Sequence, residues 1–390
     1  MDGGQEQGTP KRGTPAQDAD RAARHAAIAL ALTLPGDTVL YLLLPIYAAS
    51  FGVTLPEAGL LLAANRIVRI FGNGWIAHFY AQRGPRLTCM LAAFGSIAAA
   101  LAYATASGVW ALLVARLVWG LSFSGMNIAT QALSTSVGAG APRRMGQVRT
   151  IVAVGPTIGL LAGALIAYHY GPRGVFLLLA AVACLAPIFA WQLPSTGEKT
   201  ERKGPRIDWP DGMSIWSFAT GFTLDGLFIF GLGLLAAASY PREAVLAAGG
   251  AMALRYAVEI LFSSAGGRLG QRFGARPMLI RLTLCSAVSL ALLAAGGGLL
   301  WLGVIATIVL RALLATLSAP VVAEAYPGPA RVPALAANAT WRDIGAGLGP
   351  LIAGFVFAFA PVWAIYGCAA LLLVIAGLLL MQRGHDGRRE

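Results

Sequence analysis

Residues 194–211, PSTGEKTERKGPRIDWPD, form a polar segment between two apolar regions of similar length. The segment carries eight ionisable side chains and three prolines in eighteen residues, so a bilayer would not accept it as a spanning helix. We interpret it as a cytoplasmic linker that joins an N-terminal helical bundle, residues 25–193, to a C-terminal helical bundle, residues 212–382.

The composition of the chain is that of a membrane protein. Of its 390 residues, 57% are apolar and only 12% are charged, whereas ordinary soluble domains have about 25% charged residues. The net charge of +12 does not require a nucleic-acid partner, because the arginines outside the apolar runs concentrate in short loops. We therefore expect an all-α, multi-pass protein that contacts membrane lipid and no nucleic acid.

Neither a metal site nor a cofactor is indicated by the sequence. The four cysteines lie inside apolar segments without metal-ligand spacing, and the chain lacks the Gly-x-x-x-x-Gly-Lys-[Ser/Thr] loop of nucleotide-driven pumps. We expect no enzymatic activity, and we expect any energy for transport to come from an ion gradient.

Twelve apolar runs approach the length of about 20 residues that a membrane-spanning helix needs. The loops on the side of the linker are basic and the opposite loops contain almost no lysine or arginine, so the positive-inside rule places both termini in the cytoplasm. We expect a monomer in a bacterial inner membrane, with a disordered cytoplasmic tail at 1–24 and a second tail at 383–390. The predicted spans lie near residues 25–50, 56–80, 87–107, 109–134, 146–170, 174–193, 213–239, 243–267, 278–297, 299–325, 335–359 and 361–382.

The two bundles repeat each other's polar landmarks. Asp37 in the first span lies 47 residues before Gly84, and Asp225 in the seventh span lies 49 residues before Gly274. Similarly, Arg116 precedes a Gly-Pro pair by 39 residues, and Arg311 precedes another by 38. The repeat predicts two pseudo-symmetric six-helix bundles with a substrate site between them near the middle of the membrane.

At these landmarks the chain resembles the major facilitator superfamily. The family's loop pattern Gly-x-Leu-Ala-Asp-Arg-x-Gly-Arg-Arg is similar to residues 267–276, which include Arg272, Gly274 and Arg276, and is partly kept at 77–86 by Gly84 and Arg86. The resemblance implies a gating role for Arg86, Arg272, Gly274 and Arg276. The acid thought to latch the cytoplasmic gate in this family is absent from both copies, since Ala81 and Gln271 stand in its place.

Two further patterns strengthen the resemblance. Arg116 and Gly120 are similar to the family's Arg-x-x-x-Gly pattern, whose arginine is linked to proton coupling. Gly155-Pro156-Thr157-Ile158-Gly159 resembles the core of the antiporter signature of exporters, which implies that Gly155, Pro156 and Gly159 help to seal the pathway. The alternative is plain helix packing, because Gly155, Gly159 and Gly163 form a ladder of small residues.

Charged residues deep in the spans are candidates for the mechanism, because a charge within a bilayer usually faces a wet cavity or a partner. The arginines outnumber the acids, and an arginine fork suits a carboxylate or a phosphate, so we expect an anionic or zwitterionic substrate. The structural alternative is that the arginines pair with the acids and fix the packing of the helices. The deep acids are Asp37, Asp225, Glu259 and Asp343, and the deep arginines are Arg66, Arg69, Arg116, Arg255, Arg311 and Arg342.

Site roles follow from these positions. We predict that Asp37, Asp225 and Glu259 carry protons, although Arg255, four residues before Glu259, should pair with that acid. The predicted substrate contacts are Asn65, Arg66, Arg69, Arg116, Arg255 and Arg311. Three functions remain open: a proton-coupled exporter of a small metabolite, siderophore-like compound or drug, an importer of an organic anion, and a membrane binding protein that has lost transport.

Overall fold

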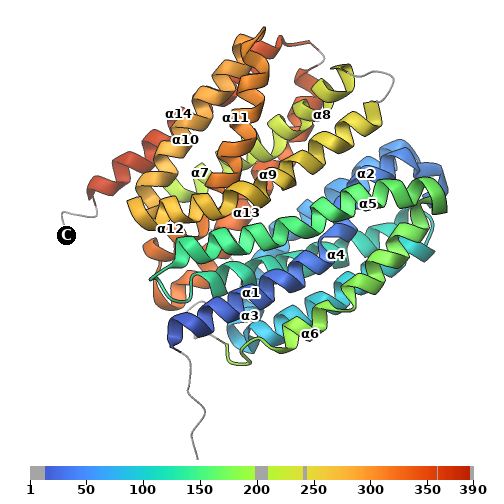
Figure 1. Cartoon of the computed structure of the whole chain (residues 1–390), viewed down its shortest axis with the longest axis horizontal. Helices are drawn as coiled ribbons and strands as arrows, with labels where there is room; N and C mark the ends of the chain where they lie inside the picture. The colour runs from blue at the N-terminus through green and yellow to red at the C-terminus, as the bar shows by residue number, and fades with distance from the viewer. Residues whose placement is uncertain (1–13, 198–209, 240–243, 358, 387–390) are drawn as a thin grey trace, which may run out of the picture.

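The computed structural model describes residues 14–197, 210–239, 244–357 and 359–386, and these residues form helices and connecting loops without a strand (Figure 1). Each of the twelve predicted spans is helical over most of its length. Most of the predicted linker, residues 198–209, lies outside the described residues, as do residues 1–13 and 387–390 of the two predicted tails.

The N-terminal half begins earlier than predicted, because helix α1 starts at Pro15. The Thr14 side chain accepts a hydrogen bond from the Gln17 amide and the Gln17 side chain accepts one from the Thr14 amide, which makes a capping box. The prediction of a disordered tail over residues 1–24 is therefore wrong from residue 15 onward. The helices of this half are α1 Pro15–Thr33, α2 Pro35–Ile46, η1 Ala48–Phe51, α3 Leu55–Thr105, α4 Val109–Ser134, α5 Ala141–Ala183 and α6 Ala186–Trp191.

Two of these helices each contain two membrane spans. Gly84 within α3 has φ of 80° and Gly171 within α5 has φ of 75°, so the chain reverses direction at both residues. Only glycine adopts this backbone region without steric cost, and each of the two is followed by a proline that can start the next helix. The spans predicted on either side of residue 84 and of residue 171 are thus present as separate helical segments.

The C-terminal half repeats this arrangement with a different first span, in which η2 is a π-helical segment between two α-helices. The last helix continues to Asp386, so the predicted tail over 383–390 begins later than expected; no proline follows Pro361 to stop the helix. The elements are α7 Gly212–Thr220, η2 Gly221–Leu227, α8 Phe228–Ser239, α9 Ala244–Phe273, α10 Ala275–Ala295, α11 Leu299–Leu314, α12 Ser318–Ala325, η4 Gly328–Ala330, α13 Arg331–Val356 and α14 Val362–Asp386.

The duplication inferred from sequence is visible in matching contacts of the two halves. Arg86 Nε donates a hydrogen bond to the carbonyl of Leu193 at 2.8 Å, and Arg276 Nη2 donates one to the carbonyl of Leu380 at 2.9 Å. In each half, an arginine after the second span therefore binds the end of the sixth span. The two halves pack against each other through α5 beside α9 and α3 beside α13 (Figure 1).

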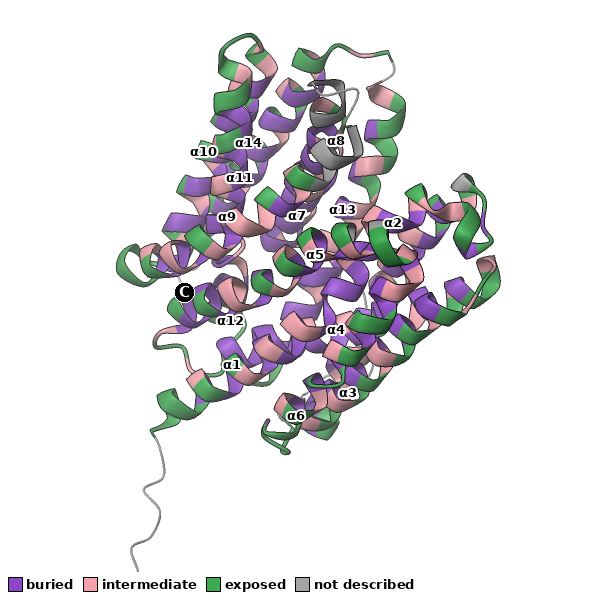
Figure 2. Cartoon of the chain, turned by 45° about the vertical axis from the view of Figure 1, so that its right-hand side comes forward, coloured by how far each residue is buried: buried purple, intermediate pink, exposed green. Residues whose placement is uncertain are grey.

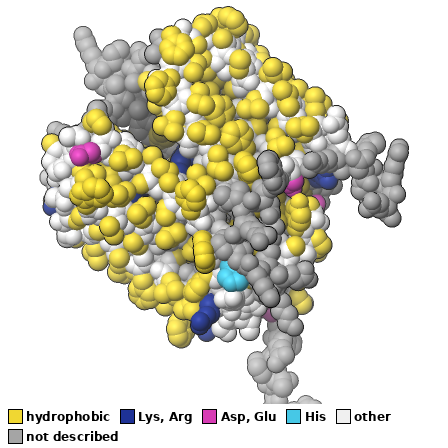
Figure 3. Space-filling model, turned by 180° about the vertical axis from the view of Figure 1, so that it is seen from behind, with side chains coloured by type: hydrophobic (Ala, Val, Ile, Leu, Met, Phe, Trp, Pro, Cys, Tyr) yellow, Lys and Arg dark blue, Asp and Glu magenta, His cyan; other side chains and the backbone are white. Residues whose placement is uncertain are grey.

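The outside of the bundle is apolar, as expected for a protein in lipid. Large side chains such as Trp110 and Phe355 are 77% and 73% exposed. Figure 2 shows exposed and half-buried residues along the outer sides of the helices, and hydrophobic side chains dominate the face seen in Figure 3. Among the described residues, nine segments are long and apolar enough to cross a membrane, and one of them, Pro56–Thr105, contains two spans. The chain is a multi-pass integral membrane protein.

Polar and glycine contacts join the two halves. We call the end of the bundle that carries Gly84, Gly274 and residues 194–197 the linker face. Thr150 of α5 and Ser264 of α9 lie 3.0 Å apart through their hydroxyl groups, and Gly146 and Gly267 pack backbone to backbone one turn nearer the linker face. These contacts join the halves on the linker-face side of the charged residues described next.

Candidate functional site

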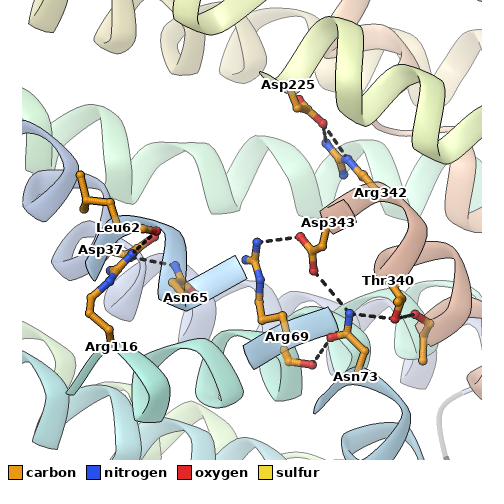
Figure 4. Close-up of polar contacts among 12 residues, drawn as sticks. Asp37, Leu62, Asn65, Arg69, Asn73, Arg116, Asp225, Thr340, Arg342 and Asp343 are labelled. Atoms are coloured by element: carbon orange, nitrogen blue, oxygen red, sulfur yellow. Dashed lines mark hydrogen bonds and ion pairs between the residues drawn. The ribbon is translucent and has the colours of Figure 1, made fainter. Parts of the chain in front are cut away.

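The N-terminal half holds a buried ion pair between Asp37 of α2 and Arg116 of α4 (Figure 4). The Arg116 side chain is 0% exposed, and its Nε donates to the carbonyl of Leu61 at 3.0 Å. Asn65 Nδ2 donates to the same Asp37 oxygen at 3.2 Å. Three spans thus meet at one carboxylate, which brings together three of the residues predicted to act in coupling or in substrate binding.

The C-terminal half holds a larger network around Asp225. Arg311 Nε and Arg342 Nη2 each lie 2.7 Å from one of its two carboxylate oxygens. Arg311 also reaches Glu259, with Nη1 2.6 Å from Oε1. Asp225 lies within the π-helical segment η2, a distortion that is frequent at functional sites. The network joins four spans of this half, since its members come from η2, α9, α11 and α13.

The predicted pair of Arg255 with Glu259 is not formed. Glu259 pairs with Arg311 of α11, while the Arg255 guanidinium lies 4.3 Å from the centre of the Tyr256 ring. Spacing along one helix made Arg255 a plausible partner, but a partner on a neighbouring helix approaches Glu259 more directly. Among the described residues, Arg255 therefore has no carboxylate within ion-pair distance.

An ion pair also joins the two halves. Arg69 Nη2 of α3 lies 2.6 Å from Asp343 Oδ1 of α13 (Figure 4). One turn nearer the linker face, Asn73 Nδ2 lies 3.2 Å from Thr340 Oγ1 and 3.4 Å from Asp343 Oδ2. The Arg69 guanidinium also stacks 4.6 Å above the Phe123 ring. All four deep acids are therefore paired with arginine.

A family comparison identifies the architecture. A family model described as the Major Facilitator Superfamily matches residues 26–240. The chain belongs to the major facilitator superfamily. Over 369 residues it is 25% identical to the multidrug resistance protein MdtG of Klebsiella pneumoniae strain 342, covering 87% of this chain and 86% of MdtG.

Solved structures of this superfamily share the fold. The human organic anion transporter MFSD10 superposes with a TM-score of 0.78 at 17% identity, over 94% of this chain and 100% of that one. The E. coli fucose:proton symporter FucP superposes with a TM-score of 0.71 at 14% identity, over 95% and 99% of the two chains. The family and these neighbours are transporters, so the chain is a transporter of this superfamily.

Three arginines in the interior of this superfamily member have no carboxylate within ion-pair distance among the described residues. They are Arg66 of α3, Arg149 of α5 and Arg255 of α9. Arg66 lies beside Gly347 of α13 in the opposite half. Arg149 and Arg255 each bury an Nε that has no hydrogen-bond partner in the part of the chain that the structure describes. Counted over the described residues, the interior has more arginines than acids.

Arg149 is not among the deep arginines predicted from the sequence. The fifth span was predicted to begin near residue 146, which places Arg149 in its first turn; in the structure α5 begins at Ala141, so Arg149 lies two turns inside the helix. The missed signal was local: Pro142 is suited to the first turn of a helix, so the span could begin several residues earlier.

The residues with predicted gating roles make contacts within their own halves. A Cβ atom on Gly155 would meet the carbonyl of Ala31 in α1, and one on Gly159 would meet Pro35. Gly349 of the second half packs in the same way against the carbonyl of Phe222. The contacts of Gly155 and Gly159 are those of close helix packing, the alternative that the sequence left open.

The remaining gating candidates lie at the linker face. Arg86 and Arg276 bind the ends of α6 and α14, as described above. The Arg272 guanidinium lies 5.2 Å from the centre of the Phe273 ring, and Gly274 has φ of 86°, which permits the turn between α9 and α10. Their roles in gating, like that of Pro156, stay predictions.

Proposed function

We propose that this chain is a proton-coupled secondary exporter of a small anionic or zwitterionic metabolite, siderophore-like compound or drug, and that it works by alternating access. The observation that carries the proposal is the charge balance of the interior. All four deep acids pair with arginine, while Arg66, Arg149 and Arg255 have no carboxylate within ion-pair distance among the described residues. An anionic substrate would supply the missing negative charge.

Coupling to protons follows from the same ion pairs. Asp37, Asp225 and Glu259 each bond to an arginine on another helix. Protonation of such a carboxylate removes the charge that holds the arginine, so the helices that the pair joins become free to shift. Release of the proton on the other side of the membrane restores the pair and returns the protein to its starting state.

Export is favoured over import by the resemblance of nearly the whole chain to MdtG, a multidrug resistance protein. For export, we place the protein in a bacterial inner membrane with its linker face in the cytoplasm, as the basic loops predict. Among the predicted substrate contacts, Arg69, Arg116 and Arg311 belong to the ion pairs, and Asn65 bonds to Asp37. Arg66 and Arg255 are the two predicted contacts without a carboxylate within ion-pair distance among the described residues, and we add Arg149 to this set.

Import of an organic anion is the second candidate. It is supported by the packing of Gly155 and Gly159 on α1 and α2, which explains these glycines without an antiporter role. The fold is also shared with FucP, which is a fucose:proton symporter.

Untargeted mass spectrometry tests the direction and the substrate together. Small molecules are compared in cells and medium of a strain that makes the protein and of one that lacks it. An anion that accumulates in the deletion cells and disappears from their medium supports export. A nutrient anion that stays unused in the medium of the deletion strain supports import and contradicts the proposal.

A further inference from the structure

The interface between α5 and α9 contains buried donors that lack an acceptor. Arg149 Nε, Arg255 Nε and Ser263 Oγ are buried side-chain atoms without a hydrogen-bond partner among the described residues. The Ser263 side chain is fully buried. Since buried polar atoms in proteins are nearly always hydrogen-bonded, three unsatisfied donors at one interface indicate that an acceptor from outside the chain belongs there.

The donors lie around a single carboxylate. Arg255 and Ser263 lie one turn before and one turn after Glu259 on α9, at spacings that place the three residues on one face of the helix. Arg149 comes from α5, and the charges of both Arg149 and Arg255 act on the Glu259 carboxylate. Glu259 does not satisfy them in the described part of the chain: it accepts a hydrogen bond from Arg311, while Arg149 Nε, Arg255 Nε and Ser263 Oγ have no partner.

The charge of the cluster points to the chemistry of the missing acceptor. Glu259 is the single acid among three arginines, Arg149, Arg255 and Arg311. A further acid whose charge acts on Arg149, Asp225, is already bonded by Arg311 and by Arg342. A neutral ligand would leave the excess charge of the arginines uncompensated in the interior of the bundle, whereas an anion would compensate it and accept hydrogen bonds from the unsatisfied donors.

We propose that one anionic group of the transported substrate, a carboxylate, sulfonate or phosphate, binds between Arg149 and Arg255 and accepts a hydrogen bond from Ser263. This inference rests on the proposed transport of an anion and names the site where the charge is recognised. Arg149 belongs to the N-terminal half and Arg255 to the C-terminal half. An anion held by both arginines draws the halves together at the interface of α5 and α9, so binding favours the conformation in which these helices are in contact.

Ligand binding to the purified full-length protein tests the site without requiring transport. Sodium benzoate and sodium benzenesulfonate serve as anionic probes, and benzyl alcohol serves as an uncharged probe of similar size. Binding is followed by the shift in the thermal unfolding temperature as each probe is titrated. We expect both anions to stabilise the wild-type protein and benzyl alcohol to have no saturable effect.

Variants of the two arginines locate the binding site. We expect Arg149→Gln and Arg255→Gln each to weaken binding of both anions by about tenfold or more, the size of a lost charged hydrogen bond. Arg149→Lys and Arg255→Lys keep the charge without the fork and should bind with intermediate affinity. Arg268→Gln is the matched control, because Arg268 is an exposed arginine on the same helix as Arg255.

The outcomes separate the site from the proposed function. Wild-type affinity in Arg149→Gln and Arg255→Gln, or no anion-dependent shift in the wild-type protein, overturns the site. Loss of binding in both variants with wild-type binding in Arg268→Gln supports it. A protein that binds anions through the two arginines but moves none across a membrane retains the site and contradicts the proposed function.

Discussion

Arg69 of the N-terminal half and Asp343 of the C-terminal half form an ion pair of 2.6 Å. The preceding residue, Arg342, reaches in another direction and binds Asp225 within its own half. Two consecutive residues of α13 therefore connect the carboxylate network of the C-terminal half to the contact between the halves (Figure 4). A change of charge at Asp225 would alter its bond to Arg342, and Arg342 is next in sequence to Asp343, which forms the ion pair between the halves.

Breaking this pair should open the linker face. We expect Arg69→Gln or Asp343→Asn to make the contact between α3 and α13 more accessible to water, because each variant removes the ion pair that joins the two halves there. The measurement is the alkylation rate, by a reagent applied from the linker face, of a cysteine placed at Thr340 in a variant without the four native cysteines. The rate should rise about tenfold, which corresponds to a shift of about 1.4 kcal/mol between the two conformations.

The exchanged pair Arg69→Asp with Asp343→Arg provides the control for this prediction. It should recover part of the wild-type protection of Thr340→Cys, with a coupling energy of about 1–3 kcal/mol between the two positions. Arg268→Gln should leave the rate unchanged, since Arg268 is exposed on α9. Equal alkylation rates in Arg69→Gln and in the wild type would mean that the pair does not hold this face closed.

The two aspartates that pair with arginine in corresponding spans should be needed for coupling. Asp37→Asn and Asp225→Asn keep the size of the side chain and remove the proton-carrying group. We expect the rate of transport driven by a pH gradient to fall about tenfold or more in each variant, because the step in which the aspartate binds and releases a proton is lost. Exchange of substrate at equal pH on both sides should persist, because it needs no net proton movement.

Glu324→Gln is the matched acid-to-amide control for the aspartates, because Glu324 is exposed at the linker face. It should transport at the wild-type rate in both assays. If Asp37→Asn and Asp225→Asn also keep wild-type rates under a pH gradient, neither residue carries the coupled proton. Size-exclusion chromatography of each variant confirms that the protein remains folded.

Glycine at position 155 should be required for packing. Gly155→Ala puts a methyl group against the carbonyl of Ala31, and both backbones must move apart. We expect the free energy of unfolding to fall by about 1–3 kcal/mol, measured as a lower thermal unfolding temperature in detergent. Gly354→Ala in α13 is the control, because its added methyl group meets no atom.

The two interpretations of the Gly155-Pro156 motif differ in what Gly155→Ala does to ion leakage. Packing alone predicts a less stable protein that still couples proton flow to substrate flow. A sealing role predicts proton leak through the variant in liposomes at a temperature where the protein remains folded. Leak without loss of stability would contradict the packing interpretation.

Much of the fold could be predicted from sequence because lipid imposes strong requirements on composition. Apolar length predicted twelve spans, and repeated landmarks such as Asp37 and Asp225 predicted two halves of one family fold. The start of α1 was predicted too late, although the Thr14 and Gln17 capping box is readable in the sequence. An amphipathic helix outside the bilayer does not need a long apolar run, so hydropathy alone does not locate its start.

Partners within the site were harder to predict, because the pairs join residues that are far apart in the chain. Asp343 is 274 residues from Arg69, and no spacing rule connects them. Spacing along α9 predicted Arg255 as the partner of Glu259, but Arg311 of α11 takes this position. The surplus of arginine could be counted from the sequence, whereas the identity of the unpaired arginines required the tertiary arrangement of the helices.

Transport by the purified protein in liposomes tests the central proposal most directly. An anion identified by the metabolite comparison is placed outside liposomes, and its uptake is followed with the lumen more acidic than the medium, with the gradient reversed, and with none. Antiport predicts uptake against the anion's own gradient only when the lumen is acidic, together with a rise in luminal pH. Uptake that does not depend on the pH gradient, or that occurs only when the medium is the more acidic side, would contradict a proton-coupled exporter.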